Sequence, residues 1–340
     1  QVRGIVQGVG FRPFVYRQAA RFALSGFVQN TSSGVTIEIE GVASACAAFL
    51  AALREEAPPL SRIQSVDQAE IRPLGGQVFH ILASEGGEKT ALISPDIGIC
   101  DDCKRELFSK EDRRYRYPFI NCTNCGPRFS IIEDIPYDRA NTSMRAFLQC
   151  PDCQGEYDNP LDRRFHAQPN ACAVCGPELT LFVGNAPQKG DAIAQFAALI
   201  RAGGIVAVKG LGGFHLACDA ANESAVQLLR ARKQRYEKPF AVMLRDMGVV
   251  RHYCAVSSEE ETLLTGAQKP IVLLQKRENA SLAPSVAPSN RRLGVMLPYT
   301  PLHCLLLEET PALVLTSGNV SDRPMHYIDQ DMPLVFASLA

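Results

Sequence analysis

Cysteine spacing is the strongest chemical signal in this sequence. Eight of the twelve cysteines form four Cys-x-x-Cys pairs, and each cysteine of the first two pairs recurs 50 positions later. Gly126-Pro127 recurs in the same way as Gly176-Pro177. This internal repeat predicts two tetrahedral Cys₄ zinc sites, which are structural because a closed site leaves no coordination position for a substrate. The expected ligands are Cys100, Cys103, Cys122, Cys125, Cys150, Cys153, Cys172 and Cys175.

Redox-active pairs and disulfides are the other common uses of paired cysteines. Four evenly spaced pairs in a chain without a secretory signal argue against both. The spacing leaves open whether the pairs join within one repeat or across the two. His166 in "RRFHAQPN" could replace a cysteine as a ligand, but a non-ligand histidine near an interface is the favoured interpretation. The remaining cysteines stand singly in apolar surroundings, and Cys46, Cys218 and Cys304 are expected to be core thiols.

A loop near the N-terminus combines glycines with an arginine. The stretch "QGVGFR" at residues 7–12 lies between a short apolar strand and a helical pattern. Backbone N–H groups around Gly8 and Gly10, the helix N-terminus and the Arg12 guanidinium would together suit a phosphate. The spacing does not match the dinucleotide fingerprint G-x-G-x-x-G, and a plain tight turn is the alternative. Asn30 ends the next predicted strand, where it is either a partner of this loop or an ordinary turn residue.

Basic residues gather a second time in the C-terminal half of the chain. They precede a predicted strand in "RARKQRYEKPFAVML", and "LTSGNVS" ends another strand. Positive charge and a Ser-x-Asn turn could converge on a nucleotide at the carboxyl edge of a sheet. Without further support, a basic helix end is more often a solvated face.

The composition limits the classes of protein to consider. The chain has 340 residues, so two or three domains are expected. It is 46% hydrophobic without an 18-residue apolar run, which predicts a packed protein and no membrane span. With 35 basic and 36 acidic residues, its net charge of -1 provides no bulk attraction to nucleic acid. The cysteine usage and the absence of a signal-peptide pattern indicate a cytoplasmic protein.

The first of three zones predicts a small α+β domain. Residues 1–83 alternate strands and helices in the order βαββαβ, which favours a ferredoxin-like sandwich with one layer of helices on one sheet. We expect one helix from Pro13 and another near residues 44–55. The second helix carries a core-facing stripe at helical spacing. That stripe consists of Cys46, Phe49, Leu50 and Leu53.

The other two zones differ in their apolar patterning. Residues 84–187 hold the polar linker "ASEGGEKT" and the cysteine pairs, and they are so poor in core residues that the fold needs another source of stability, which metal can provide. Residues 188–340 predict an α/β domain with a twisted mixed sheet flanked by helices. Asn222 is the expected N-cap of a helix through Arg232, and Thr300-Pro301 opens another helix. The strand candidates are "IVAVKG", "FAVML", "IVLL" and "ALVLTSGN", and no obvious element closes this domain before Ala340.

The N-terminal zone resembles the acylphosphatase family. The stretches "VQGVGFRPF" and "GFVQNTSSGV" carry the resemblance, and the order of elements agrees with it. The resemblance implies that Arg12 binds a phosphate and that Asn30 orients the attacking water. An acyl phosphate is already activated, so this positioning can suffice without a nucleophile or a metal.

The C-terminal zone resembles the YrdC-like family of proteins that form carbamoyl adenylates. The stretches "VAVKGLGGFHLACDA" and "GVMLPYTPLH" match it, as do its Lys-x-Arg and Ser-x-Asn motifs. The resemblance implies an ATP and carbamoyl-adenylate site. Its expected residues are Lys233, Arg235, Ser317 and Asn319, with Lys238 and Thr316 beside them, and Lys209, His215 and His303 are weaker candidates.

Together, the three zones resemble the HypF family of hydrogenase maturation carbamoyltransferases. The stretches "YRYPFINCTNCGPRF" and "NPLDRRFHAQPNAC" are among its clearest signatures. The resemblance implies cleavage of carbamoyl phosphate, then formation of carbamoyl adenylate from ATP with Mg²⁺. It also implies delivery of the carbamoyl group to the C-terminal cysteine of a partner maturation protein, with neither nucleic acid nor membrane as partner. The family's C-terminal transfer domain is absent, so the chain is expected to be a C-terminally truncated part.

Two alternatives belong to other functional classes. A YrdC-type enzyme that makes threonylcarbamoyl adenylate would use threonine and bicarbonate in place of carbamoyl phosphate. A zinc-dependent nucleic-acid-binding module would need a basic surface, which the balanced charge argues against.

Overall fold

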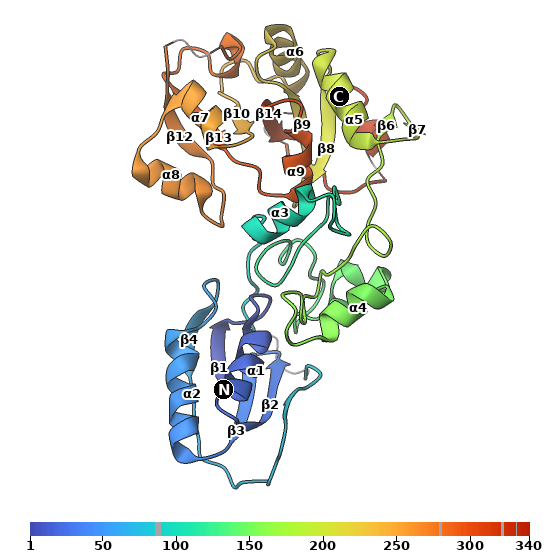
Figure 1. Cartoon of the computed structure of the whole chain (residues 1–340). Coiled ribbons are helices and arrows are strands. Elements are labelled where there is room, and N and C mark those ends of the chain that lie inside the picture. Colours follow the sequence, from blue (N-terminus) through green and yellow to red (C-terminus); the bar gives the residue numbers. More distant parts are fainter. Residues whose placement is uncertain (86–89, 279–280, 321–322, 331) are drawn as a thin grey trace. The chain divides into compact units, whose positions relative to one another are not determined.

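The structure is a computed structural model that describes residues 1–85, 90–278, 281–320, 323–330 and 332–340. Residues 86–89 of the expected linker therefore lie outside the described residues. The chain forms two compact units (Figure 1). The first unit comprises Gln1–Cys103 and Ile120–Pro177, and the second comprises Lys104–Phe119 and Glu178–Ala340.

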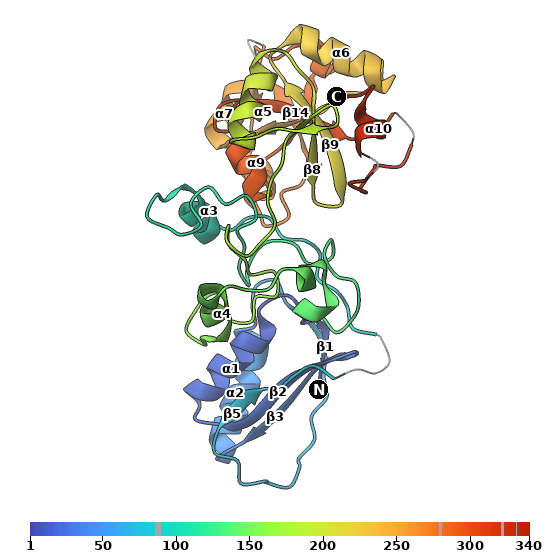
Figure 2. The same cartoon turned by 90° about the vertical axis from the view of Figure 1, so that its right-hand side faces the viewer.

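The N-terminal part of the first unit is the expected sandwich with one strand more. Helices α1 and α2 lie on one face of the sheet (Figure 2) and share a core with it. The sheet has the order β4-β1-β3-β2-β5, because β4 pairs with β1 at one edge and β5 pairs in parallel with β2 at the other. The elements are β1 (Val2–Ile5), α1 (Phe11–Arg21), β2 (Ser25–Thr31), β3 (Gly34–Glu40), α2 (Ala43–Glu55), β4 (Arg62–Val66) and β5 (Phe79–Ile81).

Helix α1 begins two residues before the predicted Pro13. Gly10 precedes the helix with a left-handed φ of 74°, and its carbonyl accepts a hydrogen bond from the Phe14 N–H at 3.0 Å. Pro13 fits inside the first turn because N–H groups there have no intrahelical acceptor. On α2, Phe49 and Leu53 of the predicted stripe are buried, whereas Leu50 and Cys46 are only partly buried.

The cysteine-rich part has little regular structure, as its sequence predicts. Helices α3 (Asp101–Phe108) and α4 (Pro151–Asp158) each begin directly after a cysteine of the repeat. Two short 3₁₀ helices, η1 (Arg139–Asn141) and η2 (Ser143–Ala146), lie between the repeats. The buried side chains of this part include Arg128 and Arg164, which donate to the backbone carbonyls of Cys122 and Asn121.

The second unit contains a seven-stranded sheet in the order β11-β12-β13-β10-β14-β9-β8. Strands β10 and β13 pair in parallel and the other neighbours of the described sheet pair antiparallel, which confirms the mixed sheet. The strands are β8 (Val206–Gly210), β9 (Gly213–Asp219), β10 (Ala241–Leu244), β11 (Cys254–Ala255), β12 (Val272–Lys276), β13 (Arg292–Met296) and β14 (Ala312–Ser317), and the hairpin β6 (Phe182–Val183) and β7 (Ala186–Pro187) stands apart. The helices are α5 (Ala192–Arg201), α6 (Glu223–Lys233), α7 (Met247–Tyr253), α8 (Ser258–Thr265), α9 (Pro301–Leu306) and α10 (Met332–Phe336), with a 3₁₀ turn η3 (Pro284–Val286).

Helix caps in the second unit follow the sequence closely. Asn222 caps α6 by accepting from the Ala225 N–H, and Thr300 caps α9 in the same way, as predicted. Helix α8 was not predicted, although Ser257 and Glu260 form a capping box whose S-x-x-E pattern is visible in the sequence. Strand β13 was also missed, because its apolar run is short.

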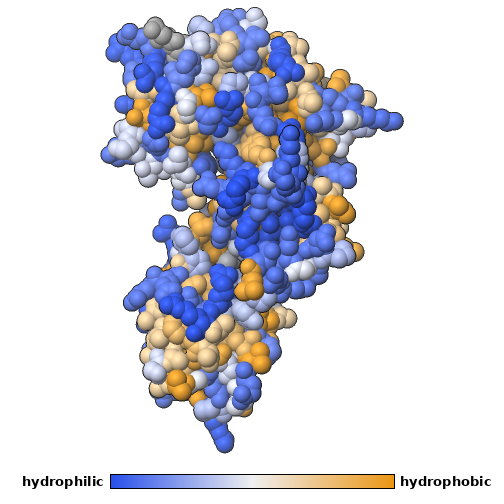
Figure 3. Space-filling view, viewed as in Figure 1, coloured by the Kyte–Doolittle hydropathy of each residue, from blue (hydrophilic) through white to orange (hydrophobic). Residues whose placement is uncertain are grey.

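The core of the second unit is apolar and contains cysteines that stand singly in the sequence. Cys218 and Cys254 belong to the main core cluster and Cys304 is also buried, which confirms the expectation for Cys218 and Cys304. On the surface, hydrophilic residues predominate over α3 and the segment after it (Figure 3). Their charges are of both signs rather than a basic stripe. Within the described residues, no helix combines the length and the hydropathy that a membrane span requires.

Candidate functional site

The eight predicted cysteine ligands form two tetrads, and each tetrad lies within one repeat. Within a tetrad all four Sγ atoms lie within 4.8 Å of one another, and neighbouring Sγ atoms are 3.6 to 3.8 Å apart. Tetrahedral zinc with Zn–S bonds of about 2.3 Å requires S–S separations of about 3.8 Å, so both tetrads can hold zinc. The first tetrad is Cys100, Cys103, Cys122 and Cys125, and the second is Cys150, Cys153, Cys172 and Cys175.

The chemical state of these cysteines also suits a metal. All are free thiols rather than disulfides. Hydrogen bonding to Cys103 lowers the pKa of Cys100 to about 6. Both Arg163 Nη atoms donate to Cys103 Sγ at 3.3 Å. The contact between the two cysteines favours the thiolate, the form that binds metal, at Cys100, whereas it raises the pKa of Cys103. His166 is in neither tetrad, so the alternative in which it replaces a cysteine is not adopted.

The two repeats adopt the same turn but present different side chains. Arg116 and His166 occupy corresponding positions and both have a left-handed backbone, with φ of 56° and 53°. In each repeat the N–H of this residue donates to a carbonyl at the end of the preceding helix, at 2.8 and 3.0 Å. Arg116 belongs to the second unit, and its side chain forms an ion pair with Glu308 of the same unit. His166 instead lines a pocket of the first unit.

The N-terminal glycine loop forms the floor of that pocket. Gly8 and Gly10 have φ of 73° and 74°, where a residue with a Cβ atom is strained. Gln7 fixes the loop to the sheet, since its Nε2 donates to the carbonyls of Thr31 and Gly34, each at 2.8 Å. The Tyr137 N–H donates to Gln7 Oε1 at 2.9 Å. The loop is therefore held from both the sheet and the cysteine-rich part.

Arg12 lies beside this loop between two polar partners. Its side chain is buried, and its Nη2 donates to Asp138 Oδ1 at 2.7 Å. Asn30 is 1% exposed, and its amide is best oriented with Oδ1 toward Arg12, accepting from Nε and Nη2 at 3.2 Å each. The structure thus brings the two predicted residues of this site into direct contact. The guanidinium of Arg12 is therefore already paired with one carboxylate, that of Asp138.

Arg128 connects the glycine loop to the first tetrad. It is 2% exposed, and its Nε donates to the Gly8 carbonyl. Its Nη2 donates to the carbonyls of Cys122 and Thr123 at 3.0 Å, and its Nη1 donates to that of Cys125 at 3.2 Å. A single buried cation therefore joins the backbone of two tetrad cysteines, Cys122 and Cys125, to the glycine loop.

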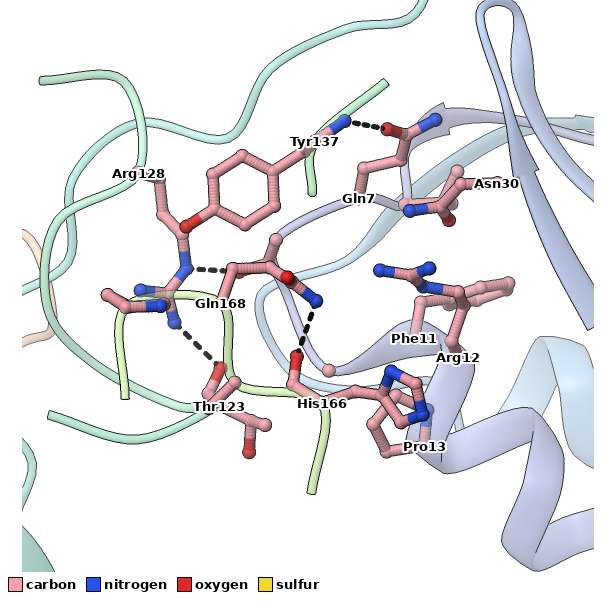
Figure 4. Close-up of a pocket in the computed structure, with 15 residues that line it drawn as sticks. Gln7, Phe11, Arg12, Pro13, Asn30, Thr123, Arg128, Tyr137, His166 and Gln168 are labelled. Atoms are coloured by element: carbon pink, nitrogen blue, oxygen red, sulfur yellow. Dashed lines mark hydrogen bonds between the residues drawn. The ribbon is translucent and has the colours of Figure 1, made fainter. Parts of the chain in front are cut away.

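The pocket combines residues of the sheet domain with residues of the repeats (Figure 4). Gln168 Nε2 donates to the His166 carbonyl at 3.0 Å, and its Oε1 accepts from the Arg139 N–H at 2.7 Å. Burial, followed by the nearby charge of Arg12, lowers the pKa of His166 to about 4, so this imidazole is neutral at pH 7. The lining comprises Val6, Gln7, Gly8, Gly10, Phe11, Arg12, Pro13, Asn30, Thr123, Arg128, Tyr137, His166, Ala167, Gln168 and Pro169.

The second predicted site lies at the end of β14. Lys233 is 1% exposed, and its Nζ donates to the carbonyls of Ser317 and Asn319 at 2.5 Å each and to Asn319 Oδ1 at 3.2 Å. Ser317 Oγ donates to Asn319 Oδ1 at 2.6 Å. Burial lowers the pKa of Lys233 to about 8. Lys233 therefore organises the Ser-x-Asn turn through its charge.

The other residues predicted for this site are arranged less tightly. Arg235 donates to the Lys238 and Pro239 carbonyls, and Lys238 itself is exposed. Thr316 is partly buried next to Ser317 on β14. Lys209 forms an ion pair with Asp329 at 2.5 Å. His215 and His303 lie with ring centroids 6.4 Å apart, and Ser317 pairs with His215 across the sheet.

Sequence reasoning missed Asp138, Arg128 and Tyr137, which contact the anion loop from more than 100 residues away. None of them stands in a pattern that indicates such a contact. A local signal existed only for Arg128, because the repeat aligns it with Glu178 and so marks it as a position where the two halves differ.

Comparison with known families agrees with this architecture. The chain matches family models described as acylphosphatase over residues 1–81, HypF finger over residues 99–132 and 150–182, and telomere recombination (Sua5/YciO/YrdC) over residues 198–336. The first of these stretches is also similar to the acylphosphatase of Deinococcus radiodurans, with 42% identity over 81 residues, which are 24% of this chain and 92% of that protein.

Longer relatives cover nearly the whole chain. The carbamoyltransferase HypF of Rhizobium leguminosarum bv. viciae is 51% identical over 333 residues, or 96% of this chain and 42% of that protein. A crystal structure of full-length HypF in the phosphate- and nucleotide-bound form superposes with a TM-score of 0.96 at 50% identity, covering 100% of this chain and 45% of that one. The chain thus spans less than half the length of these relatives. The chain belongs to the HypF carbamoyltransferase family, with an acylphosphatase domain, a HypF finger and a Sua5/YrdC-like domain in that order.

Proposed function

We propose that this chain cleaves carbamoyl phosphate at the anion loop around Gly8 and Gly10. Water breaks the bond between the carbamoyl group and the phosphate, which gives carbamate and inorganic phosphate. The observation that carries the proposal is the buried contact between Arg12 and Asn30 beside this loop. Similarity to HypF proteins and to an acylphosphatase supports it.

The residues of the pocket would act by position and charge. Arg12 and the loop N–H groups neutralise the phosphate, and Asn30 orients the attacking water through its amide. Because an acyl phosphate is already activated, placing water and stabilising charge can supply most of the acceleration. Asp138 keeps the Arg12 guanidinium in place between turnovers.

The second site would use the carbamate. We propose that carbamate reacts there with the α-phosphate of ATP, forming carbamoyl adenylate and releasing pyrophosphate. Lys233, Ser317 and Asn319 would form the core of the site, with Arg235, Lys238 and Thr316 at its rim. Mg²⁺ bound to ATP would screen the triphosphate charge. Support comes from the cluster at the end of β14 and from a HypF structure described as phosphate- and nucleotide-bound.

The metals and the acceptor complete the proposal. Zinc in the two tetrads would be structural, because four thiolates leave no open position. The carbamoyl group would finally pass to the C-terminal cysteine of a partner hydrogenase maturation protein; the printed name of the relatives, carbamoyltransferase, supports the transfer but names no acceptor. That transfer would need parts of the relatives that this chain does not span.

The test measures two products separately. Purified protein receives carbamoyl phosphate and Mg-ATP, and inorganic phosphate and pyrophosphate are assayed in parallel. We expect phosphate from carbamoyl phosphate alone, and pyrophosphate only when both substrates are present. Pyrophosphate formed from threonine, bicarbonate and ATP without carbamoyl phosphate would instead show a threonylcarbamoyl-adenylate enzyme and overturn the proposal.

A further inference from the structure

We propose that His166 selects the carbamoyl group of the substrate, with its Nδ1 accepting a hydrogen bond from the carbamoyl N–H₂. This inference rests on the proposed cleavage of carbamoyl phosphate at the anion loop. It assigns a specificity role to a residue of the second cysteine repeat rather than of the acylphosphatase domain.

The position of His166 is fixed by its surroundings. Its backbone has φ of 53°, and its N–H donates to the Tyr157 carbonyl at 3.0 Å. Its ring packs edge-on against Phe165 and tilted against Tyr157, with centroid distances of 4.6 and 5.0 Å. Figure 4 shows the ring beside Pro13 and below the Arg12 guanidinium. The imidazole is therefore presented to the anion site by a preformed turn.

His166 also carries an unused polar atom. Among the described residues that line the pocket, it is the one whose buried side-chain polar atom, Nδ1, has no hydrogen-bond partner. Gln168, beside it, is satisfied on both sides, since Nε2 donates to the His166 carbonyl and Oε1 accepts from Arg139 and Tyr157. Buried polar atoms are rarely left unpaired, so Nδ1 points to a ligand that the pocket is built to hold.

The chemistry of the pocket indicates which kind of ligand atom this is. Burial, and after it the charge of Arg12, lowers the pKa of the ring, so the imidazole is neutral and one of its two nitrogens is an acceptor; we assign that role to the unpaired Nδ1. An acceptor there requires a donor on the ligand. The phosphate of an acyl phosphate offers only acceptors, whereas the carbamoyl end offers an N–H₂ group. An acetyl group has almost the same shape but a methyl in that place, so Nδ1 would distinguish the two.

The test compares kcat/KM for carbamoyl phosphate and acetyl phosphate in three proteins. His166→Gly removes the ring and His166→Asn places Oδ1 close to the position of Nδ1, and both residues tolerate the left-handed backbone. We expect His166→Gly to lower the ratio of carbamoyl to acetyl phosphate cleavage about tenfold or more by loss of one hydrogen bond, while acetyl phosphate cleavage stays unchanged. His166→Asn should restore part of the ratio.

Arg116→Gly is the matched control, because Arg116 holds the same left-handed position in the first repeat. It should leave both substrates unaffected. An equal fall in kcat/KM for both substrates in His166→Gly, or no change in kcat/KM for either, would overturn the selection role. If His166→Gly loses zinc, His166→Asn decides alone: a lowered ratio of carbamoyl to acetyl phosphate cleavage with unchanged acetyl phosphate cleavage supports the inference, and an unchanged ratio overturns it. Failure of the unmodified protein to cleave carbamoyl phosphate would instead reject the proposed function.

Discussion

The two cysteine repeats have the same scaffold, but they differ at positions that contact the rest of the chain, and two of these positions illustrate the difference. Arg128 is buried and binds the anion loop, whereas Glu178, its counterpart 50 residues later, is exposed. Arg116 pairs with Glu308, whereas His166 faces the anion pocket with an unpaired nitrogen. The backbone of the turn repeats, whereas the side chains at these two positions do not. Differences between repeats are therefore the place to look for function.

Removing one cysteine ligand from either tetrad should give the largest difference in activity between the two repeats. Cys122→Ser and Cys172→Ser should each lower the bound zinc from two ions to one, measured by elemental analysis. Only Cys122→Ser should also reduce carbamoyl phosphate cleavage about tenfold or more, because Arg128 binds the Cys122 carbonyl and the anion loop together.

Equal loss of cleavage in the two cysteine variants would contradict the special link between the first tetrad and the loop. Cys46→Ser is the control for thiol loss, since Cys46 belongs to neither tetrad and should change neither zinc content nor activity.

Arg128→Ala and Glu178→Ala compare the first of the two divergent positions. Arg128→Ala leaves several buried carbonyls without a donor, so we expect the free energy of unfolding to fall by about 3–5 kcal/mol. Glu178→Ala should change it by less than about 0.5 kcal/mol, as is usual for an exposed side chain. Denaturant unfolding of both variants measures the difference, and similar values would argue against Arg128 as the connection.

The second divergent position predicts a dependence on pH. The pKa of His166 is lowered to about 4 in the folded chain, so the unfolded chain binds the proton more strongly. Its contribution to stability is therefore complete above about pH 6.5 and is lost as the pH falls toward 4. Between pH 7 and 5, this should remove about 2 kcal/mol from the free energy of unfolding.

His166→Asn has no titrating ring and isolates this contribution. The variant should lose less stability than the unmodified protein between pH 7 and pH 5, while carboxylates and metal ligands titrate equally in both. Parallel pH profiles would show that His166 is not buried beside a positive charge as the structure places it.

Arg116→Ala should have the smallest effect in this series. The ion pair between Arg116 and Glu308 is about one third exposed on each side, and such pairs contribute up to about 1 kcal/mol. We expect a correspondingly small fall in the free energy of unfolding and no change in carbamoyl phosphate cleavage. High salt should shrink the difference, since exposed ion pairs are screened.

Local patterns explain what could be predicted from the sequence. The cysteine spacing predicted two Cys₄ sites and their eight ligands but not how the pairs group, and Asn222 and Thr300 indicated their helix starts, because each signal depends on neighbours within one turn or one repeat. Gly8 and Gly10 marked the tight turn before α1 because a left-handed backbone favours glycine, and anion binding by this loop stays a prediction. Such features need no knowledge of the rest of the fold.

Long-range contacts account for what was missed. Asp138 meets Arg12 across 126 residues of sequence and sits in no recognisable motif. His166 was considered only as a metal ligand or an interface residue, since its place in the pocket depends on how the second repeat packs on the glycine loop. The predicted order has one strand after the second helix, where the structure has two, β4 and β5. Both strands are short, and their pairing at opposite edges of the sheet is a long-range feature that no local pattern shows.

The most direct test of the central claim is the rate of inorganic phosphate release from carbamoyl phosphate by Arg12→Ala. Arg3→Ala is its control, because Arg3 is an exposed arginine of the same domain, and its ion pair with Asp67 lies at the surface. The account predicts a loss of about 100-fold or more in Arg12→Ala, the scale for removing a key charge-stabilising donor, and no loss in Arg3→Ala. Phosphate release that is unchanged in Arg12→Ala would contradict an acyl-phosphate site at this loop.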